Sequence, residues 1–437
     1  MPDHARSTDS AVQHQLDRLW ALSPGADILG LERITELLAR VGNPHERLPP
    51  VLHVAGTNGK GSTCAFLRAG VEAAGYTTHV YSSPHLVRFN ERIRLAGRLI
   101  DDAELAPLLA EVLDAGGDIG ASFFEVTTAV AFLAFSRTPA GACIVEVGLG
   151  GRLDATNVIA EPIVTGIAQL GIDHERFLGS DPEGIAAEKA GIAKPHVPLV
   201  TMRYPPRIEA RIASVARAAD APIAAEGGHW SWSADETHVT YRDAAGRVTT
   251  PLPRLAGSHQ QANLALAIAM LRHQRALTIP PGAYVAAAEQ AAWPARLQRL
   301  GPGPLTAKLP GRAVLVDGGH NADAAQAIAA ALADAAPIDL IFGLMKNRRI
   351  ADVLGPIAPL VRTAHVAPLI GHEHHDPRDI AAFAQAHAAP RHCYPALSLE
   401  QAIDRLSSDP DGAPLVLIAG SLYLAGEALA ANEEIPV

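Results

Sequence analysis

The chain contains few cysteines, no excess of basic residues and no long apolar run. Its three cysteines (Cys64, Cys143 and Cys393) lie far apart and form no CxxC pair, which argues against a disulfide framework or zinc ribbon and favours a reducing, cytoplasmic location. Lys and Arg number 36 against 46 Asp and Glu, a formal net charge of −10, which disfavours a non-specific nucleic-acid-binding protein. Residues 1–20 lack a signal-peptide pattern, and no apolar run reaches the roughly 18 residues of a transmembrane helix, so no membrane span is predicted.

The remaining composition is that of a soluble α/β enzyme of 437 residues, 48% hydrophobic and 19% charged. Apolar runs at 51–55, 144–147, 163–167 and 198–202 alternate with helical patterns, which predicts a mostly parallel sheet covered on both faces. Residues 230–250 alternate with period two and predict an antiparallel hairpin. A second series of runs, at 313–316, 339–342, 363–366 and 415–419, follows a hinge at 293–296. We therefore predict two α/β domains, 1–296 and 297–437.

A glycine-rich loop follows the first apolar run. Val51–Ala55 leads into Gly56-Thr57-Asn58-Gly59-Lys60-Gly61-Ser62-Thr63 and then into a helical pattern. This order cradles phosphates, because glycines let backbone N–H groups turn inward and the helix N-terminus is electropositive. One glycine separates Lys60 from Ser62, so the spacing departs from the common GxxxxGK[ST], and a plain glycine-rich turn is the alternative.

Gly-Thr-Asn-Gly-Lys-Gly-Ser resembles the loop of the Mur ligase superfamily, in particular of the folylpolyglutamate synthase/dihydrofolate synthase family. Further matching segments follow in order over nearly the whole chain: 81–86, 90–93, 146–157, 173–174, 188–192, Asn263, 294–296 and 317–321. Gly319 and Ala322 depart from the usual Asp-Gly-Ala-His-Asn-Pro. The resemblance implies an N-terminal P-loop ATPase domain that also binds pterin, and a smaller Rossmann-like C-terminal glutamate-ligase domain.

The resemblance also implies an ATP site between the two domains. Lys60 would contact the β- and γ-phosphates, Asn263 the adenine, Arg296 the phosphates and Asp317 the ribose. The implied ATP-binding residues are Thr57, Asn58, Gly59, Lys60, Gly61, Ser62, Asn263, Arg296, Asp317 and His320.

Two Mg²⁺ sites are implied by the same family, held by Ser83, Glu146, His174 and Lys189. Glu146 ends an apolar run, where a carboxylate is costly unless it is paired or metal-bound, so a buried salt bridge is the alternative. The family carries a carbamylated lysine at the position of Lys189; the alternative is that Lys189 forms a surface ion pair with Glu188. A monovalent cation is a further candidate ligand. The cluster His372-Glu373-His374-His375-Asp376 is interpreted as an exposed loop rather than a zinc site.

Ser122-Phe123-Phe124-Glu125 begins a helical pattern and matches the family segment that binds the pterin ring, although core packing of the two aromatics is the alternative. Aromatics are only 5% of the chain. Arg88, Arg92 and Arg94 are candidates to position substrate carboxylates. The implied substrate-binding residues are Ile28, Leu29, Gly30, Ser122, Phe123, Phe124, Glu125, Leu153, Asp154 and Ala155.

The expected function is an ATP-dependent ligase that joins L-glutamate to dihydropteroate and to tetrahydrofolate through an acyl phosphate, releasing ADP and phosphate. Its partners would be these small molecules, with no nucleic acid or membrane, and the protein would be a monomer. A folylpolyglutamate synthase with one activity, a cell-wall Mur ligase and a phosphate-loop protein without ligase activity remain as alternatives.

Overall fold

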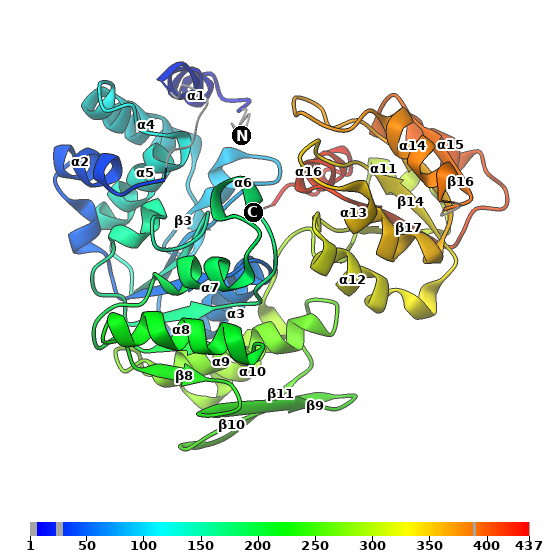
Figure 1. Ribbon diagram of the computed structural model, residues 1–437. Coiled ribbons are helices and arrows are strands. Elements are labelled where there is room, and N and C mark those ends of the chain that lie inside the picture. The colour runs from blue at the N-terminus through cyan, green and yellow to red at the C-terminus, as the bar shows by residue number, and fades with distance from the viewer. Residues whose placement is uncertain (1–6, 23–28, 388–389, 437) are drawn as a thin grey trace. The chain divides into compact units, whose positions relative to one another are not determined.

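The computed structural model describes residues 7–22, 29–387 and 390–436 (Figure 1). Within these residues the chain forms two compact units. The first runs to Arg254 and takes up Gln260–Ala292, and the second consists of Leu255–His259 and Trp293–Pro436. The fold is mixed α/β, with one mostly parallel sheet in each unit, as predicted.

The first unit is built on an eight-stranded sheet in the order β4-β3-β2-β5-β1-β6-β7-β8. The β2–β3 and β3–β4 pairs are antiparallel, and the other pairs are parallel. β1 and β5 are central and buried at every residue, which explains their continuous apolar sequences. The strands are β1 Val51–Ala55, β2 Thr78–Tyr81, β3 Ile93–Leu95, β4 Arg98–Leu99, β5 Ala142–Glu146, β6 Val164–Ile167, β7 Leu199–Thr201 and β8 Ile223–Ala225.

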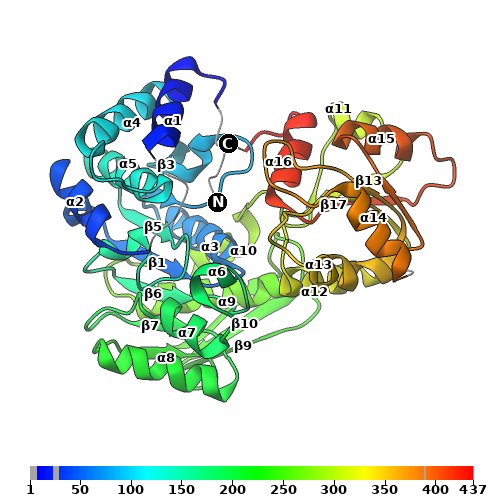
Figure 2. The ribbon, with the colours of Figure 1, turned by 45° about the horizontal axis from the view of Figure 1, so that its top comes forward.

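Helices cover both faces of this sheet (Figure 2). On one face Met270 of α9 fills the space above Gly166 of β6, and α3 packs on α9 and α10 through Gly70. On the other face α5 packs against β2 and β3 in a core shared with α1, α2 and α4. The helices are α1 Ser10–Leu22, α2 Glu32–Arg40, α3 Lys60–Ala73, α4 Asp102–Gly116, α5 Phe123–Arg137, α6 Glu175–Leu178, α7 Pro182–Ala190, α8 Pro206–Ala218, α9 His259–His273 and α10 Pro281–Gln290, with 3₁₀ turns η1 Pro44–Arg47, η2 Phe89–Arg92 and η3 Ala155–Val158.

The predicted hairpin is present with one strand more than expected. β10 (His238–Asp243) and β11 (Gly246–Pro251) form it, and β9 (Trp230–Ala234) pairs antiparallel with β10. Arg272 of α9 holds this small sheet through two 2.6 Å hydrogen bonds to Asp243. Residues 230–250 include two turns, one between β9 and β10 and one between β10 and β11. A glycine (Gly246) stands only at the second turn.

The second unit has a six-stranded sheet in the order β12-β13-β17-β14-β15-β16. Only the β12–β13 pair is antiparallel, and a separate buried core lies between this sheet and its helices. The four predicted strands are all present, and the short edge strands β12 and β16 were not predicted. The elements are β12 Gln298–Arg299, α11 Pro304–Ala307, β13 Ala313–Val316, α12 Ala322–Ala331, η4 Ala333–Ala335, β14 Ile338–Phe342, α13 Ile350–Ile357, η5 Ala358–Leu360, β15 Val361–Val366, α14 Pro377–Ala386, β16 His392–Pro395, α15 Leu399–Ser407, β17 Leu415–Ala419 and α16 Leu422–Ala431.

Among the described residues, no helix has both the length and the hydropathy needed to cross a lipid bilayer.

Candidate functional site

The glycine-rich loop joins the carboxyl end of β1 to the N-terminus of α3. The backbone N–H groups of Thr57 and Asn58 donate to the Gln169 carbonyl at 2.8 and 3.1 Å, and the Thr57 hydroxyl donates to the Gly171 carbonyl at 2.9 Å. The segment after β6 therefore fixes the start of the loop. The first N–H groups of a helix lack intrahelical acceptors, so the end of the loop offers donors to an anion, with Lys60 beside them.

Asn263 of α9 lies directly against this loop. Gly59 adopts a left-handed conformation (φ 82°), and a Cβ there would stand only 2.3 Å from Asn263 Oδ1. Asn263 is buried, and its Nδ2 donates to Gln260 Oε1 at 3.0 Å. The structure thus brings together two residues predicted to bind the nucleotide, Gly59 and Asn263, that are separated by about 200 residues in the sequence.

Glu146 ends β5, which neighbours β1 in the sheet, so its carboxylate lies at the same strand edge as the loop. The side chain is 4% exposed, and Oε2 accepts from the Ser83 backbone N–H at 3.4 Å. Two predicted metal ligands are therefore neighbours. A buried carboxylate of this kind suits a hard divalent cation at bound phosphates.

Lys189 lies at the end of α7 and is 3% exposed. Its Nζ donates to the Gly56 carbonyl at 3.0 Å, at the start of the glycine-rich loop. Burial, reinforced by the nearby charge of Lys60, lowers the pKa of Lys189 to about 7, against the opposing effect of Asp173 and Asp154. The surface ion pair considered above is wrong, because Glu188 pairs with Arg152 instead, at 2.8 Å.

His174 is exposed and adopts a left-handed conformation (φ 53°) just before α6. The neighbouring Asp173 is buried, and its Oδ1 accepts from the His174 N–H at 2.6 Å. The charge of Asp173 opposes the lowering of the Lys189 pKa, so the two side chains lie near each other. The Asp-His motif was visible in the sequence, but only the burial of its first residue distinguishes Asp173.

Over the described residues, no three His, Cys, Asp or Glu side chains gather closely enough to hold a metal ion. The loop 372–376 is instead fixed within the second unit: His374 Nδ1 lies 2.7 Å from the His372 carbonyl, and His375 Nε2 lies 2.7 Å from the Arg348 carbonyl. In the first unit, the unmodified side chain of Lys189 ends in an ammonium cation or a neutral amine nitrogen. A hard cation such as Mg²⁺ prefers oxygen ligands, so Lys189 fits this metal only once its amine has been converted into an anionic oxygen ligand.

The predicted acceptor segment caps α5. Ser122 Oγ accepts from the Glu125 N–H at 3.2 Å, and Glu125 Oε2 accepts from the Ser122 N–H at 2.7 Å and from Arg33 Nε at 3.1 Å. Phe123 is buried and stacks on Trp20 with ring centroids 5.0 Å apart, so core packing accounts for this ring. The carboxylate of Glu125 thus fixes the helix start rather than facing solvent.

Phe124 is half-buried and crosses close over Gly148, where a Cβ would lie 2.4 Å from the ring. Ala155 is buried in the core against which Phe124 packs, and Leu153 is half-buried nearby in sequence. Leu29 and Gly30 are half-buried just before α2. Ile28 lies outside the described residues.

Asp154 is buried, and its carboxylate accepts from the N–H groups of Leu149 (2.8 Å) and Thr156 (3.0 Å). Burial raises its pKa. His53 of β1 supports this arrangement through a 2.9 Å contact between its Nε2 and Thr156 Oγ1. His53 and Thr156 were not predicted, because nothing in the sequence shows that β1 passes beneath residues 154–156.

Among the three arginines after β2, Arg92 is buried, and its Nε donates to His85 Nδ1 at 2.9 Å. Its guanidinium lies 5.3 Å from the centre of the Phe123 ring. Arg92 therefore links the segment of His85 to the Phe123 ring at the start of α5.

The other predicted ATP residues lie in the second unit. Asp317 follows β13, and its carboxylate accepts from the N–H groups of Leu297 (2.8 Å) and Gly319 (2.7 Å). His320 Nδ1 lies 3.0 Å from the Gly318 carbonyl, and the Arg296 guanidinium lies beside Gly318. Arg296, Asp317 and His320 therefore form one local cluster. The lack of a side chain at Gly318 leaves room chiefly for Leu422, since a Cβ there would lie 2.3 Å from Leu422 Cδ2 and 3.3 Å from Arg296 Nη1.

Comparison with known proteins identifies the family of the chain. Residues 303–422 match the family model described as "Mur ligase, glutamate ligase domain". The dihydrofolate synthase/folylpolyglutamate synthase of Escherichia coli (strain K12) is 34% identical over 402 residues, covering 90% of this chain and 89% of the relative.

Two solved structures extend the match to nearly the whole chain. The Escherichia coli enzyme in complex with DHPP and ADP superposes with a TM-score of 0.87 at 31% identity, covering 98% of this chain and 99% of that one. A bifunctional folylpolyglutamate synthase/dihydrofolate synthase with Mn, AMPPNP and L-glutamate bound superposes with a TM-score of 0.83 at 30% identity. This match covers 97% of this chain and 99% of that one. The identity and coverage of these relatives show that the chain belongs to the dihydrofolate synthase/folylpolyglutamate synthase family of Mur ligases.

Proposed function

We propose that the protein is an ATP-dependent ligase that adds L-glutamate to dihydropteroate and to tetrahydrofolate. The observation that carries this proposal is the strand edge where the phosphate loop, Glu146 and the buried Lys189 meet. Membership of the family supports the same reaction, because a solved relative holds a nucleotide analogue and L-glutamate together.

In the proposed reaction a carboxylate oxygen of the acceptor attacks the γ-phosphorus of ATP. The bond to the bridging oxygen breaks, leaving ADP and an acyl phosphate. The α-amine of glutamate then attacks the acyl carbon, phosphate departs with the former carboxylate oxygen, and the amine proton passes to solvent. Lys60 and the N-terminus of α3 hold the phosphates, so most of the catalysis is positioning and charge neutralisation.

Glu146 and Ser83 would hold one Mg²⁺, and His174 and a carbamylated Lys189 a second. When bound, Mg²⁺ neutralises charge on the transferring phosphoryl group. A pKa of about 7 leaves much of Lys189 as a free amine near neutral pH. Its nitrogen attacks the carbon of CO₂ and loses a proton to solvent, and the resulting carbamate is anionic. A monovalent cation is proposed as a further ligand.

For nucleotide binding we assign Thr57–Ser62 and Asn263 in the first unit and Arg296, Asp317 and His320 in the second. For the acceptor we assign Phe124, Leu153, Asp154 and Ala155, with Leu29 and Gly30 before α2. Ser122, Phe123 and Glu125 shape this site by holding the start of α5. The buried Asp154 supports this site by accepting from the N–H groups of Leu149 and Thr156, which holds the turn that carries Leu153 and Ala155.

We further propose a monomer in the cytoplasm. The three cysteines are free and buried, which suits a reducing compartment. Light scattering of the purified protein tests the oligomeric state.

The test of function supplies each acceptor separately with ATP and glutamate and measures the amide product and ADP. Product with both acceptors supports the two activities; product with tetrahydrofolate alone leaves a folylpolyglutamate synthase. A cell-wall Mur ligase or a nucleotide-binding protein without ligase activity would give no glutamate-dependent product with either.

The metal assignment is tested by Lys189→Ala, which is expected to lower kcat by at least about a hundredfold. Lys194→Ala is the matched control, because Lys194 also carries a lowered pKa but bonds the Asn157 carbonyl away from the phosphate loop. Wild-type turnover in Lys189→Ala would contradict the assignment.

A further inference from the structure

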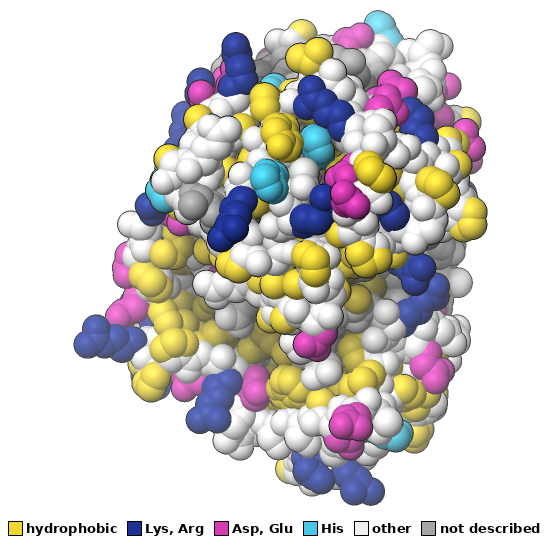
Figure 3. All heavy atoms as spheres, turned by 90° about the vertical axis from the view of Figure 1, so that its right-hand side faces the viewer, with side chains coloured by type: hydrophobic (Ala, Val, Ile, Leu, Met, Phe, Trp, Pro, Cys, Tyr) yellow, Lys and Arg dark blue, Asp and Glu magenta, His cyan; other side chains and the backbone are white. Residues whose placement is uncertain are grey.

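The second unit contains a cavity of about 610 Å³ that none of the residues assigned above enters. It lies over the outer strands β15 and β16 and beneath the end of α15. On the face of the molecule shown in Figure 3, histidines gather among basic side chains in this region. Its size is within the usual range for small-molecule sites. The lining residues are Arg362, Thr363, His365, His392, Tyr394, Pro395, Arg405 and Asp409.

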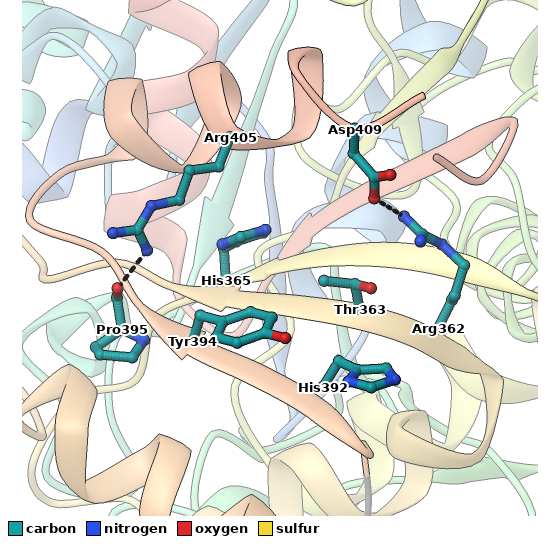
Figure 4. A pocket seen from close by; sticks show the side chains of 8 residues that line it. All are labelled: Arg362, Thr363, His365, His392, Tyr394, Pro395, Arg405 and Asp409. Atoms are coloured by element: carbon teal, nitrogen blue, oxygen red, sulfur yellow. Dashed lines mark hydrogen bonds and ion pairs between the residues drawn. The ribbon is translucent and has the colours of Figure 1, made fainter. Parts of the chain in front are cut away.

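The strand register places four side chains on one face. Thr363 pairs with His392, and His365 pairs with Tyr394, across the parallel β15–β16 ladder. The rings of His365 and Tyr394 are 5.8 Å apart and tilted by 32°, so they form an aromatic floor. Figure 4 shows these rings in the middle of the cavity, with Arg405 at one end and the Arg362–Asp409 pair at the other.

The two arginines of the cavity differ in their partners. Arg362 is neutralised by Asp339 and by Asp409, at 2.8 and 2.6 Å. Arg405 donates to the Pro395 carbonyl at 2.6 Å and forms no ion pair within the described part of the chain. Asp339 is also paired with Arg312, so the inner charges balance and Arg405 supplies the unneutralised positive charge.

His365 supplies a donor on the floor. The residue is 6% exposed, and among the described residues its buried Nδ1 has no hydrogen-bond partner. Burial, with the charge of Arg405, lowers the pKa of His365 to about 4, so the ring is neutral. A proton on Nδ1 would be a buried donor without an acceptor, which favours the tautomer with the proton on Nε2. The Nε2–H is then available to a ligand.

We propose that this cavity is a second ligand site, which binds an oxyanion carried by a planar molecule, with the anionic group between Arg405 and His365 and the planar part on Tyr394. The shared chemistry is a carboxylate or a phosphate, since both match a guanidinium fork. The site is separate from the proposed ligase residues, and the proposal does not depend on them.

The test uses inorganic phosphate, benzoate and the neutral isostere benzamide as probes, each at up to about 10 mM, a range suited to weak fragments. Binding is followed by the NMR signals of the histidine rings in the full-length protein, with His365 assigned from the signal lost in His365→Gln. Arg405→Gln is the test variant, and Arg378→Gln is its control, because Arg378 is an exposed arginine of the same unit bonded to Asp376.

Benzoate or phosphate is expected to shift the His365 signal, and Arg405→Gln should weaken that binding about tenfold while ligase turnover is unchanged. Binding of benzoate alone identifies an aromatic carboxylate, and binding of phosphate alone a phosphate ester. The proposal is overturned if no probe shifts His365, if benzamide binds as well as benzoate, or if Arg405→Gln binds as well as Arg378→Gln.

Discussion

Among the proposed metal ligands, Lys189 is the residue whose pKa is shifted by burial. The lysine pKa falls from 10.5 to about 7 on burial. Between these values the unfolded chain binds a proton that the folded chain does not, so stability rises with pH through this window. Below about pH 7 both states are protonated, and the full cost of the buried ammonium remains.

Lys189→Met removes that cost. In bicarbonate-free buffer we expect the variant to unfold at a higher temperature than the wild type at pH 6, by at least about 2 °C, with the difference shrinking as pH rises toward 10. Calorimetric melts from pH 6 to 10 measure it. A difference that does not vary with pH would mean that Lys189 keeps an ordinary pKa.

Gly59 permits a contact that no other residue would. Alanine there would force a Cβ to within 2.3 Å of Asn263 Oδ1, in addition to the strain of φ 82°. Gly75 has a similar φ of 92° with nothing within 4 Å of its Cβ position, so Gly75→Ala carries the strain alone, about 1 kcal/mol. We expect Gly59→Ala to weaken ATP binding by at least about tenfold and Gly75→Ala to leave it unchanged, as measured by calorimetric titration.

At the scale of elements, the start of α5 links helix capping to the acceptor site. Ser122→Ala removes the cap and should lower the free energy of unfolding by about 1 kcal/mol. Ser398→Ala removes the corresponding cap of α15, where Ser398 Oγ accepts from the Gln401 N–H at 3.1 Å, and should cost a similar amount.

The two variants should differ in kinetics. Ser122→Ala should raise KM for the pterin acceptor several-fold with little change in KM for ATP, because Phe124 and Glu125 begin the same helix turn. Ser398→Ala should change neither. Equal KM values for the acceptor in both variants would separate α5 from the acceptor site.

The elements show where sequence reasoning succeeds. β1, α3 and the strand of Glu146 were predictable from the sequence. Each strand is a continuous apolar run followed by glycines, a pattern that indicates a buried parallel strand, and in β1 the run leads into a helix. β12 and β16 are two and four residues long at sheet edges, and too short to show a period. Asp173, His53 and Thr156 were missed because their importance lies in burial and long-range contacts, and the Arg405 cavity depends on a strand register that no local pattern reveals.

At the scale of the whole molecule, each unit has its own sheet and core. The buried cluster of the second unit draws on residues from Leu297 to Ala419 only. A separate core of this kind should fold alone, so we expect the fragment 293–437 to unfold cooperatively, with a single transition by circular dichroism and fluorescence.

A shorter fragment, 313–437, provides the matched control. It lacks β12 and α11, and with them the bonds from Thr306 N–H to Asn432 Oδ1 (3.1 Å), from Asn432 Nδ2 to the Gly301 carbonyl (3.1 Å) and from Leu297 N–H to Asp317 Oδ2 (2.8 Å). Each lost hydrogen bond leaves its remaining partner unpaired in the fragment and lowers the free energy of unfolding by about 1 kcal/mol. The fragment 313–437 should therefore unfold at a denaturant concentration well below that of 293–437. If 293–437 showed no cooperative transition, the second unit would depend on the first for its stability, and the boundary near residue 293 would describe contacts but not an independently folding domain.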